Sequence, residues 1–463
     1  MDVNDVMDQA LTILQRKPID GYEIYVNQSS HFDIESMDGK IETLQTDRYL
    51  GMAFRILNHQ RIGFSYTTLS NPSPSAPRNF SGELDRMIED AIRSAEATSP
   101  DPCFDFAPES KGIFQDLPIF DEALEGISEK AKIDKAKDLE ASAKAVDPDR
   151  IKKVRKASYQ EFLSRITLVN SNGLRHSYNT SLASASVTAV AEESGESEVA
   201  WDFDTSHFFK DLDVEKVGRS AGRRALERLG GKRIPTGVYP VLIRNQVASE
   251  FLSLLAHSFF ADQVQKGKSP LKGKRGERFF SPLLTVVDDG LYSKGISTTP
   301  FDGEGMPSQR TVLVAQGELT HYLYDRYWAN RENLCSPESR AVSTGNSRRH
   351  GIKAPPGVGV SNFFILPGNL DFPKLMEGFL HGVVVEEVMG LHTVDPISGD
   401  FSLGCSGDWI DKGQKVHPVK SIAIAGNLFE LFRRLVEIGE DLRFFGAVGA
   451  PSLLIDGLLI SGN

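Results

Sequence analysis

The chain has 463 residues, of which 40% are hydrophobic and 25% are charged, and its formal net charge is −11. The composition is that of a globular protein, and a chain of this length is longer than one hydrophobic core ordinarily includes. Two or three domains are therefore expected. The acidic balance argues against a broad nucleic-acid-binding surface, because such a surface needs clustered cations facing phosphates.

Cysteine usage and apolar runs indicate the compartment. Cys103, Cys335 and Cys405 lie far apart and form no CxxC pair, which favours a reducing compartment and excludes a zinc site built from cysteines. No stretch approaches the roughly 20 continuous apolar residues of a membrane span. The amino terminus carries no apolar signal region. A cytoplasmic protein that does not enter membranes is therefore expected.

The first half of the chain alternates between strands and covering helices. Apolar spacing predicts helices over 5–16, 81–95, 127–145 and 214–229. Period-two patterns predict strands over 22–26, 31–36, 40–45, 50–57, 61–67, 162–169, 174–180 and 184–191. Asn172-Gly173 is the strongest hairpin signal, and a proline-rich loop covers 99–118. Residues 1–230 are therefore predicted to form an N-terminal α+β domain.

The second half is glycine-rich and mostly β. Residues 230–237 are typical of an interdomain linker, so a C-terminal β-rich domain is predicted over 231–463. Its strands are expected at 237–243, 283–287, 311–314, 363–366, 381–388, 422–425 and 453–460, and its helices at 246–263, 371–379 and 427–438. The irregular stretch 330–357 is long enough to be either functional or mobile. The predicted fold class is α+β, with two domains of mostly antiparallel sheet and covering helices.

The segment 245–262 has the apolar spacing of a helix and carries His257 on its flank. Metal-dependent hydrolysis from a helix requires a second ligand and a carboxylate base on the same side. Glu250 is the nearest carboxylate, but two turns separate it from His257 by roughly 10 Å along the axis. Taken alone, the segment is interpreted as a structural helix.

Three other places could carry chemistry. His381, Glu386 and His392 lie close in sequence, but the valines between them predict a strand, so solvated charges are favoured over a metal site. The stretch 395–408 is rich in Asp, Ser and Gly but lacks both EF-hand spacing and a P-loop lysine, which favours a hairpin turn. Cys405 has no nearby histidine in sequence and is interpreted as inert.

A series of short glycine- and acid-containing segments runs from about Gly237 to the carboxyl terminus. In chain order they comprise Asp262, Gly267, Ser269, Gly273, Gly276, Glu277, 285–290, 301–306, 343–346, 361–364, 367–368, 398–402, 409–413, 418–419, 424–427 and 450–453. Taken together, this order resembles the TldD/PmbA family, also called modulator of DNA gyrase. The family comprises cytoplasmic zinc metalloproteases and their partners.

The resemblance also indicates a branch of the family. TldD-like members carry His-Glu-x-x-x-His on the helix before the Asp/Gly pattern, and a cysteine near the carboxyl terminus completes the zinc site. Aligned on Asp262, this chain has Leu252 for the first histidine, Ser253 for the glutamate and His257 for the second histidine, and 441–450 contains no cysteine. It therefore resembles the TldE/PmbA branch, with His257 as a vestigial position and no catalytic residue or metal ligand assigned.

The resemblance implies that a TldD-like partner forms a heterodimer with this chain and supplies the zinc, while this chain itself holds no cofactor. The implied substrates are unfolded or linear peptides, and the sequence leaves open which residues contact them and whether the isolated chain forms a homodimer. One alternative is a stand-alone metallopeptidase in which His257 joins His381, Glu386 or His392. The other alternative is a non-enzymatic regulator that binds DNA gyrase or a toxin–antitoxin protein.

Overall fold

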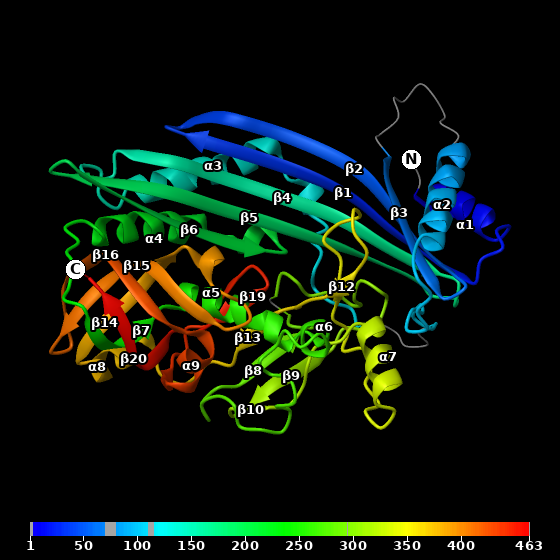
Figure 1. Ribbon diagram of the computed structural model, residues 1–463. Helices are drawn as coiled ribbons and strands as arrows, with labels where there is room; N and C mark the ends of the chain where they lie inside the picture. The colour runs from blue at the N-terminus through cyan, green and yellow to red at the C-terminus, as the bar shows by residue number, and fades with distance from the viewer. Residues whose placement is uncertain (1–2, 70–79, 110–114, 294, 463) are drawn as a thin grey trace.

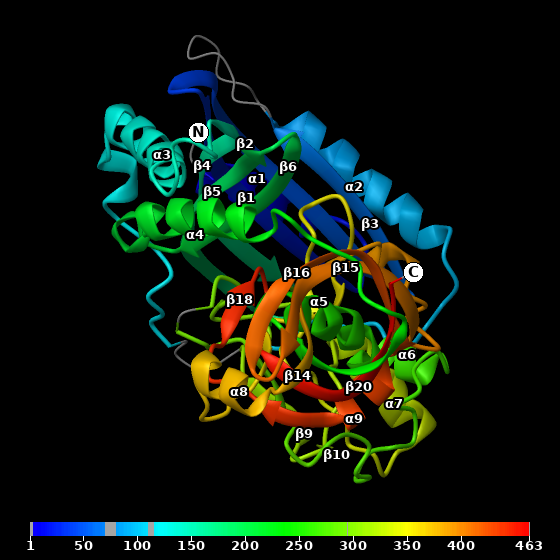
Figure 2. The ribbon, with the colours of Figure 1, turned by 90° about the vertical axis from the view of Figure 1, so that its left-hand side faces the viewer.

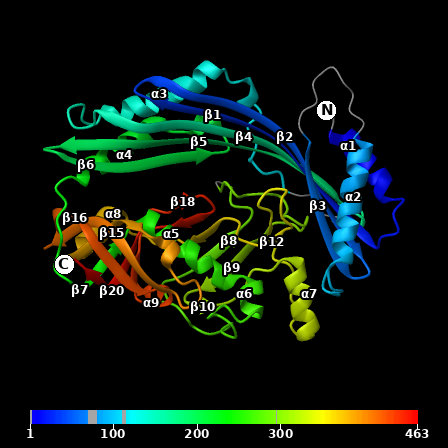
Figure 3. The same ribbon diagram turned by 45° about the horizontal axis from the view of Figure 1, so that its top comes forward.

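The computed structural model describes residues 3–69, 80–109, 115–293 and 295–462. In these ranges the chain forms three six-stranded sheets and one two-stranded sheet, together with short and medium helices. The named strands in these ranges pair antiparallel except for β13 with β19 and β14 with β7, so the predicted α+β class is confirmed. The first sheet is long and curved, and it lies over the sheets of the second half (Figures 1 and 3).

The first sheet has the order β3-β2-β1-β4-β5-β6 and is antiparallel throughout. Its strands are β1 (Gly21–Met37), β2 (Lys40–Asn58), β3 (Arg61–Leu69), β4 (Lys153–Asn170), β5 (Arg175–Glu193) and β6 (Glu196–Ser206). Its helices are α1 (Val3–Leu14), α2 (Ser81–Glu96), α3 (Glu129–Lys144) and α4 (Val214–Glu227). The apolar sides of α1 and α2 pack over one end of the sheet, and those of α3 and α4 pack over the other.

The strands of this sheet are longer than the sequence predicted. Two predicted strands, 22–26 and 31–36, form the single strand β1, because the polar run between them pairs on both sides: Asn27 lies opposite Gly51 of β2 and Ile166 of β4. Polar residues that suggested a turn therefore occupy the middle of a two-sided ladder. In the same way, 40–45 and 50–57 merge into β2, and 174–180 and 184–191 merge into β5.

The second half contains a closed ring of strands around a helix. The order β16-β15-β14-β7-β20 closes through a further pairing of β16 with β20, and β17 extends β20. The ring strands are β7 (Gly237–Ile243), β14 (His381–Met389), β15 (Asp400–Asp411), β16 (Gln414–Asn427) and β20 (Leu453–Ser461), with β17 at Leu435–Ile438. Helix α5 (Asn245–Ala256) lies within the curve of these strands (Figure 2).

A flatter sheet adjoins the ring, with the order β10-β9-β8-β13-β19-β18. Its strands are β8 (Val286–Asp289), β9 (Arg310–Ala315), β10 (Glu318–Leu319), β13 (Phe363–Ile365), β18 (Arg443–Phe445) and β19 (Val448–Ala450). The remaining short elements are α6 (Ala261–Gln265), α7 (Arg326–Cys335), α8 (Phe372–Gly378), α9 (Leu428–Arg433), β11 (Ser347–Arg348) and β12 (Gly357–Val358). One core joins the ring, α5 and this sheet.

Several boundaries in the second half differ from the sequence predictions. The predicted helix 427–438 ends at Arg433 and the chain continues as β17, because Leu435 and Ile438 pair with β20. Helix α7 lies in a stretch predicted to be irregular, and β15 was not predicted as a strand. Part of the predicted loop 99–118, residues 110–114, lies outside the described residues.

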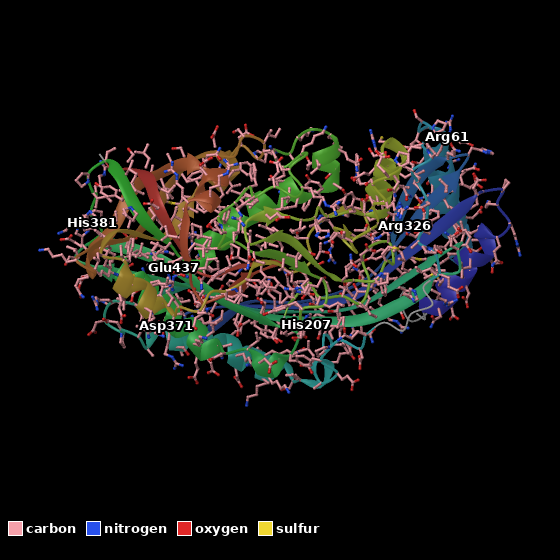
Figure 4. The ribbon with its side chains drawn as sticks, turned by 90° about the horizontal axis from the view of Figure 1, so that it is seen from below. Arg61, His207, Arg326, Asp371, His381 and Glu437 are labelled. Atoms are coloured by element: carbon pink, nitrogen blue, oxygen red, sulfur yellow. The ribbon has the colours of Figure 1, made fainter. Side chains whose placement is uncertain are left out.

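Polar contacts join the first half of the chain to the second half. Two of their residues are labelled in Figure 4: Arg326 forms an ion pair with Asp105, and His207 places Nε2 3.1 Å from the carbonyl oxygen of Gly295. Elsewhere Arg443 Nη2 lies 2.5 Å from Asp202. These contacts fix the sheet over the second half. No described helix is both long and apolar enough to cross a membrane.

Candidate functional site

Helix α5 is buried on every side but one. Phe251, Leu252 and Leu255 are fully enclosed, and the ring of Phe251 lies 5.0 Å from that of Phe401 on β15. Ser253 and His257 are exposed and are four positions apart. Because residues at this spacing share one face of a helix, α5 presents a single narrow polar face.

The predicted helix 246–263 is interrupted directly after His257. A short 3-10 turn covers His257–Phe259, Phe260 is extended, and α6 begins at Ala261. The cause is a distant segment: Leu323 accepts from the amide of Ala261 at 2.9 Å and donates to the carbonyl of Phe259 at 2.9 Å. His257 therefore stands at the carboxyl end of α5, with its ring 5.1 Å from that of Phe260.

The exposed face of α5 opens into a cavity of about 760 Å³, called here the His257 cavity. Its floor comprises Ser253, Ala256, His257, Phe260, Asp262 and Gln263, and its roof comprises Tyr25, Ile166 and Tyr178 of the first sheet. Its walls include Phe301–Gly303, Trp328, Ser347–His350, Gly357–Val360, Ala447 and Val448. The cavity thus lies between the two halves of the chain, which is a common location for ligand sites.

Charge and aromatic groups shape the roof of the His257 cavity. The guanidinium of Arg349 lies 4.5 Å from the ring centre of Tyr25, and its Nε donates to the carbonyl of Gly303 at 2.7 Å. Burial raises the pKa of Tyr25 to about 12 and raises that of Tyr178 further, so both phenols keep their protons at neutral pH. The side chains of the roof are therefore uncharged, and Arg349 is a cation beside them.

Several of the segments that carried the family resemblance build the cavity wall. The carboxylate of Asp302 accepts from the amides of Glu304, Met306 and Ser347 at 2.9, 2.9 and 3.0 Å. Burial, together with the charge of Glu304, raises the pKa of Asp302 to about 7. Behind the wall, Asp288 accepts from Asn346 and from the amide of Ser361, both at 2.7 Å. The acidic motifs thus act through backbone and amide hydrogen bonds that hold this wall.

The positions aligned with the zinc motif have different surroundings. Ser253 and His257 face the cavity, whereas Leu252 is 0% exposed in the core. Ala447 and Val448, from the stretch 441–450, line the same cavity. A zinc site needs three or more nitrogen, sulfur or carboxylate ligands converging at about 2 Å, and this set of side chains does not fit one. Among the described residues, no group of three or more His, Cys, Asp and Glu side chains could hold a metal ion.

The alternative metal set is not brought together. His381 Nδ1 lies 3.2 Å from Asp411 at the far end of the ring (Figure 4), and Glu386 lies 3.3 Å from Arg244. His392 is in a short turn between β14 and β15. None of the three lines the His257 cavity.

The remaining candidate residues are structural. Cys405 is buried within β15, and burial raises its pKa to about 12, which keeps the thiol protonated. Glu250 does not line the His257 cavity, and its Oε1 accepts from Gln246 at 3.4 Å. In the stretch 395–408, Asp395 caps a tight turn through the amide of Ile397 at 2.8 Å, after which the chain continues as β15.

Sequence reasoning did not single out most of the cavity wall. Tyr25, Tyr178 and Trp328 are aromatic residues in otherwise ordinary strands or helices, and nothing local marks them. Arg348 and Arg349 lie within 330–357, a stretch whose unusual length was the one available signal that it could be functional.

Comparisons with known proteins agree with this architecture. Three family models match the chain. Residues 22–95 match PmbA/TldA metallopeptidase domain 1, residues 122–229 match the central domain, and residues 236–462 match the C-terminal domain. The chain is 27% identical to Metalloprotease PmbA of Escherichia coli O157:H7 over 464 aligned positions, covering 100% of this chain and 96% of that protein.

Solved structures share the fold over the whole chain. A candidate modulator of a DNA gyrase from Thermotoga maritima superposes with a TM-score of 0.87 at 26% identity, covering 99% of this chain and 100% of the other. TldE from Thermococcus kodakarensis superposes with a TM-score of 0.86 at 21% identity, covering 99% of each chain.

The curved sheet and the closed ring around α5 are the α+β fold of a protein class whose three domain descriptions all name a metallopeptidase. The matched segments extend through both halves of the chain. The chain belongs to the PmbA/TldD family.

Proposed function

We propose that this chain is the TldE/PmbA-type subunit of a heterodimeric zinc metalloprotease, and that a TldD-like partner supplies the zinc and the general base. The observation that carries the proposal is the His257 cavity. Ser253, His257 and the stretch around Val448 converge on it. The positions aligned with the zinc motif supply one imidazole and one hydroxyl, whereas a zinc peptidase needs three ligands and a carboxylate base, and this supports the proposal.

In this proposal the chain binds and orients an extended peptide. The cavity volume of about 760 Å³ is within the range of about 300–1,000 Å³ typical of ligand sites. Its wall contains the short β11–β12 pair, and Gly357 of β12 is exposed. An extended peptide can add to such an edge through main-chain hydrogen bonds, which accept many sequences alike. This supports unfolded or linear peptides as the substrate class.

The test measures cleavage of an unstructured fluorogenic peptide by three samples at matched concentration: this chain, a TldD-like protein carrying His-Glu-x-x-x-His, and their mixture. Cleavage is expected in the mixture, together with a 1:1 complex by size-exclusion chromatography with light scattering. Elemental analysis of each chain purified alone should find zinc in the partner and none in this chain.

Other outcomes would replace the proposal. Cleavage by this chain alone, with stoichiometric metal bound to it, would indicate a stand-alone peptidase. An inactive mixture in which this chain nevertheless binds DNA gyrase or a toxin–antitoxin protein would indicate a non-enzymatic regulator.

A further inference from the structure

A second cavity, of about 630 Å³, lies at the amino-terminal end of α5. Residues of α4, α8, β14, β15, β16 and β18 surround it together with the first residues of α5. Figure 2 shows α4, β18 and α8 one below another along one side of the molecule. Seven cationic side chains line it, against three carboxylates, in a protein whose net charge is −11. We call it the basic cavity.

Three cations of the basic cavity lack an acidic partner. In the part of the chain that the structure describes, Lys216, Arg223 and Arg224 form no ion pair. Arg224 is half-buried and donates only to neutral acceptors, the carbonyl of Trp201 at 3.1 Å and Gln246 at 3.0 Å. Burial lowers its pKa. Glu386 and Asp202 act on Arg224 from beyond ion-pair distance, and each is paired with another arginine. A partly desolvated guanidinium without a paired carboxylate is costly unless an anion completes its surroundings.

Two further arginines are held in place by aromatic rings. The guanidinium of Arg244 lies 3.7 Å from the ring centre of Phe372, and that of Arg443 lies 5.1 Å from Phe203 and 5.0 Å from Phe445. Stacking on a ring fixes the plane of a guanidinium and leaves its edge N–H groups able to donate. These cations are therefore preorganised rather than mobile surface charges.

The amino-terminal end of α5 adds to the positive potential. Arg244 is the N-cap residue, and its side chain forms no capping hydrogen bond. The nearby carboxylate of Asp441 lies 3.6 Å from Nη1 of Arg244. Asn245 and Gln246, the first two residues of α5, line the basic cavity. The first amides of a helix lack intrahelical acceptors and favour an anion, particularly a phosphate.

The acidic residues of the lining do not neutralise the cavity. Glu386 pairs with Arg244 at 3.3 Å, and Asp408 pairs with Lys415 at 2.8 Å. Glu227 is the remaining carboxylate of the lining, so one negative charge is left to balance three unpaired cations. An excess of positive charge remains for a ligand.

We propose that the basic cavity binds a small phosphate-bearing molecule, contacted by Arg223, Arg224 and the amino-terminal end of α5. Planar guanidinium groups bind phosphate oxygens in a bidentate manner, and a multiply charged anion matches the excess of cations better than a single carboxylate does. This site is separate from the His257 cavity and does not depend on the proposed subunit role.

The test is calorimetric titration of the full chain with inorganic pyrophosphate at fixed ionic strength. Saturable binding is expected, and Arg224→Gln should weaken it about tenfold or more, because a charge-assisted hydrogen bond is lost. The double variant Lys216→Gln, Arg223→Gln changes only exposed residues. It should give the same loss with an unchanged thermal midpoint. Arg86→Gln, an exposed helical arginine outside the cavity, is the matched control and should bind within twofold of the original chain.

Three results would overturn the proposal. The first is the absence of saturable binding at millimolar pyrophosphate. The second is equal binding by the double variant and by Arg86→Gln, which would show that any binding is non-specific. The third is tighter binding of glutarate than of pyrophosphate, which would assign the cavity to carboxylates instead.

Discussion

Arg55 of β2 places Nη1 3.4 Å from Oε1 of Glu304, a residue nearly 250 positions away in the second half of the chain. The same nitrogen lies 3.2 Å from Glu23 of β1. The three side chains are 7%, 5% and 1% exposed. Glu23 also pairs with Arg349 in the wall of the His257 cavity. A buried ionic cluster thus links the first sheet to the wall of the candidate site.

Replacing Arg55 by Met should destabilise the fold strongly. The change removes the cation that pairs with two buried carboxylates, Glu23 and Glu304. Loss of one partner from a buried ion pair typically lowers the unfolding free energy by about 3–5 kcal/mol. Arg93→Met is the matched control, since Arg93 pairs with Asp90 at the surface of α2 and should leave the urea midpoint nearly unchanged. Similar urea midpoints for the two variants would show that the cluster contributes little.

Asp325 should make the fold less stable as the pH rises towards neutrality. Burial and the charge of Glu304 raise the pKa of Asp325 to about 7, well above its unfolded value of about 4. Between these values the folded chain binds the extra proton, so this carboxyl lowers the unfolding free energy as pH rises from about 4 to 7.

Asp325→Asn removes this titration. In the original chain the amide of Trp328 donates to Oδ1 of Asp325 at 2.9 Å, and the side-chain oxygen of an asparagine can still accept this hydrogen bond. Unfolding free energies measured from pH 5 to 8 should therefore fall less steeply for the variant than for the original chain. The exposed Asp149 provides the control, because Asp149→Asn should follow the original pH profile. Parallel profiles for all three proteins would refute a raised pKa at Asp325.

Local signals in the sequence were enough to predict part of this fold. The Asn172-Gly173 turn was predicted because the two residues alone specify it, and Gly173 adopts φ of +90°. The break after His257 was missed because it depends on Leu323, more than 60 positions away. The long strand β1 was missed because Asn27 is polar locally yet paired on both sides.

The candidate site was only partly predictable for the same reason. His257 was singled out on the flank of its helix, and Ser253 through the alignment with the family motif. Tyr25, Arg348 and Val448 belong to the same cavity but come from three separate elements. Only long-range pairing brings these segments together, and neither periodicity nor local composition encodes it.

A side chain at Gly305 should destabilise the junction of the two halves. Gly305 adopts φ of +86°, and an added Cβ would lie 2.6 Å from the side chain of Leu174, which directly precedes β5. Gly195 has nearly the same φ, +85°, but nothing within 4 Å of such a Cβ. Gly195→Ala therefore measures the backbone cost alone, about 1 kcal/mol. Gly305→Ala should cost about 1–3 kcal/mol more by urea unfolding, because the core must shift. Equal losses would mean that the junction can relax.

Restoring the two missing motif residues should have unequal effects on stability. Leu252→His places an imidazole in a fully buried apolar site and should cost about 2–5 kcal/mol, through lost packing and an unsatisfied polar group. Ser253→Glu changes an exposed position and should be within about 0.5 kcal/mol of the original chain. Thermal and urea unfolding of the two variants measure the difference. A well-tolerated Leu252→His would show that the core around α5 readily accepts a ligand at this position.

Filling the His257 cavity should impair peptide cleavage more than removing its imidazole does. His257→Ala should leave cleavage by the mixture with a TldD-like partner within about threefold, because the proposed chemistry resides in the partner. Ser253→Trp projects a large ring from the exposed face of α5 into the cavity and should raise KM or abolish cleavage, since the space for an extended peptide is reduced. Lys137→Trp, on the exposed side of α3, controls for the added bulk. Urea unfolding of each variant confirms that the fold is intact. If His257→Ala abolishes cleavage while the complex still forms, His257 takes part in the reaction and the proposed division of labour is wrong.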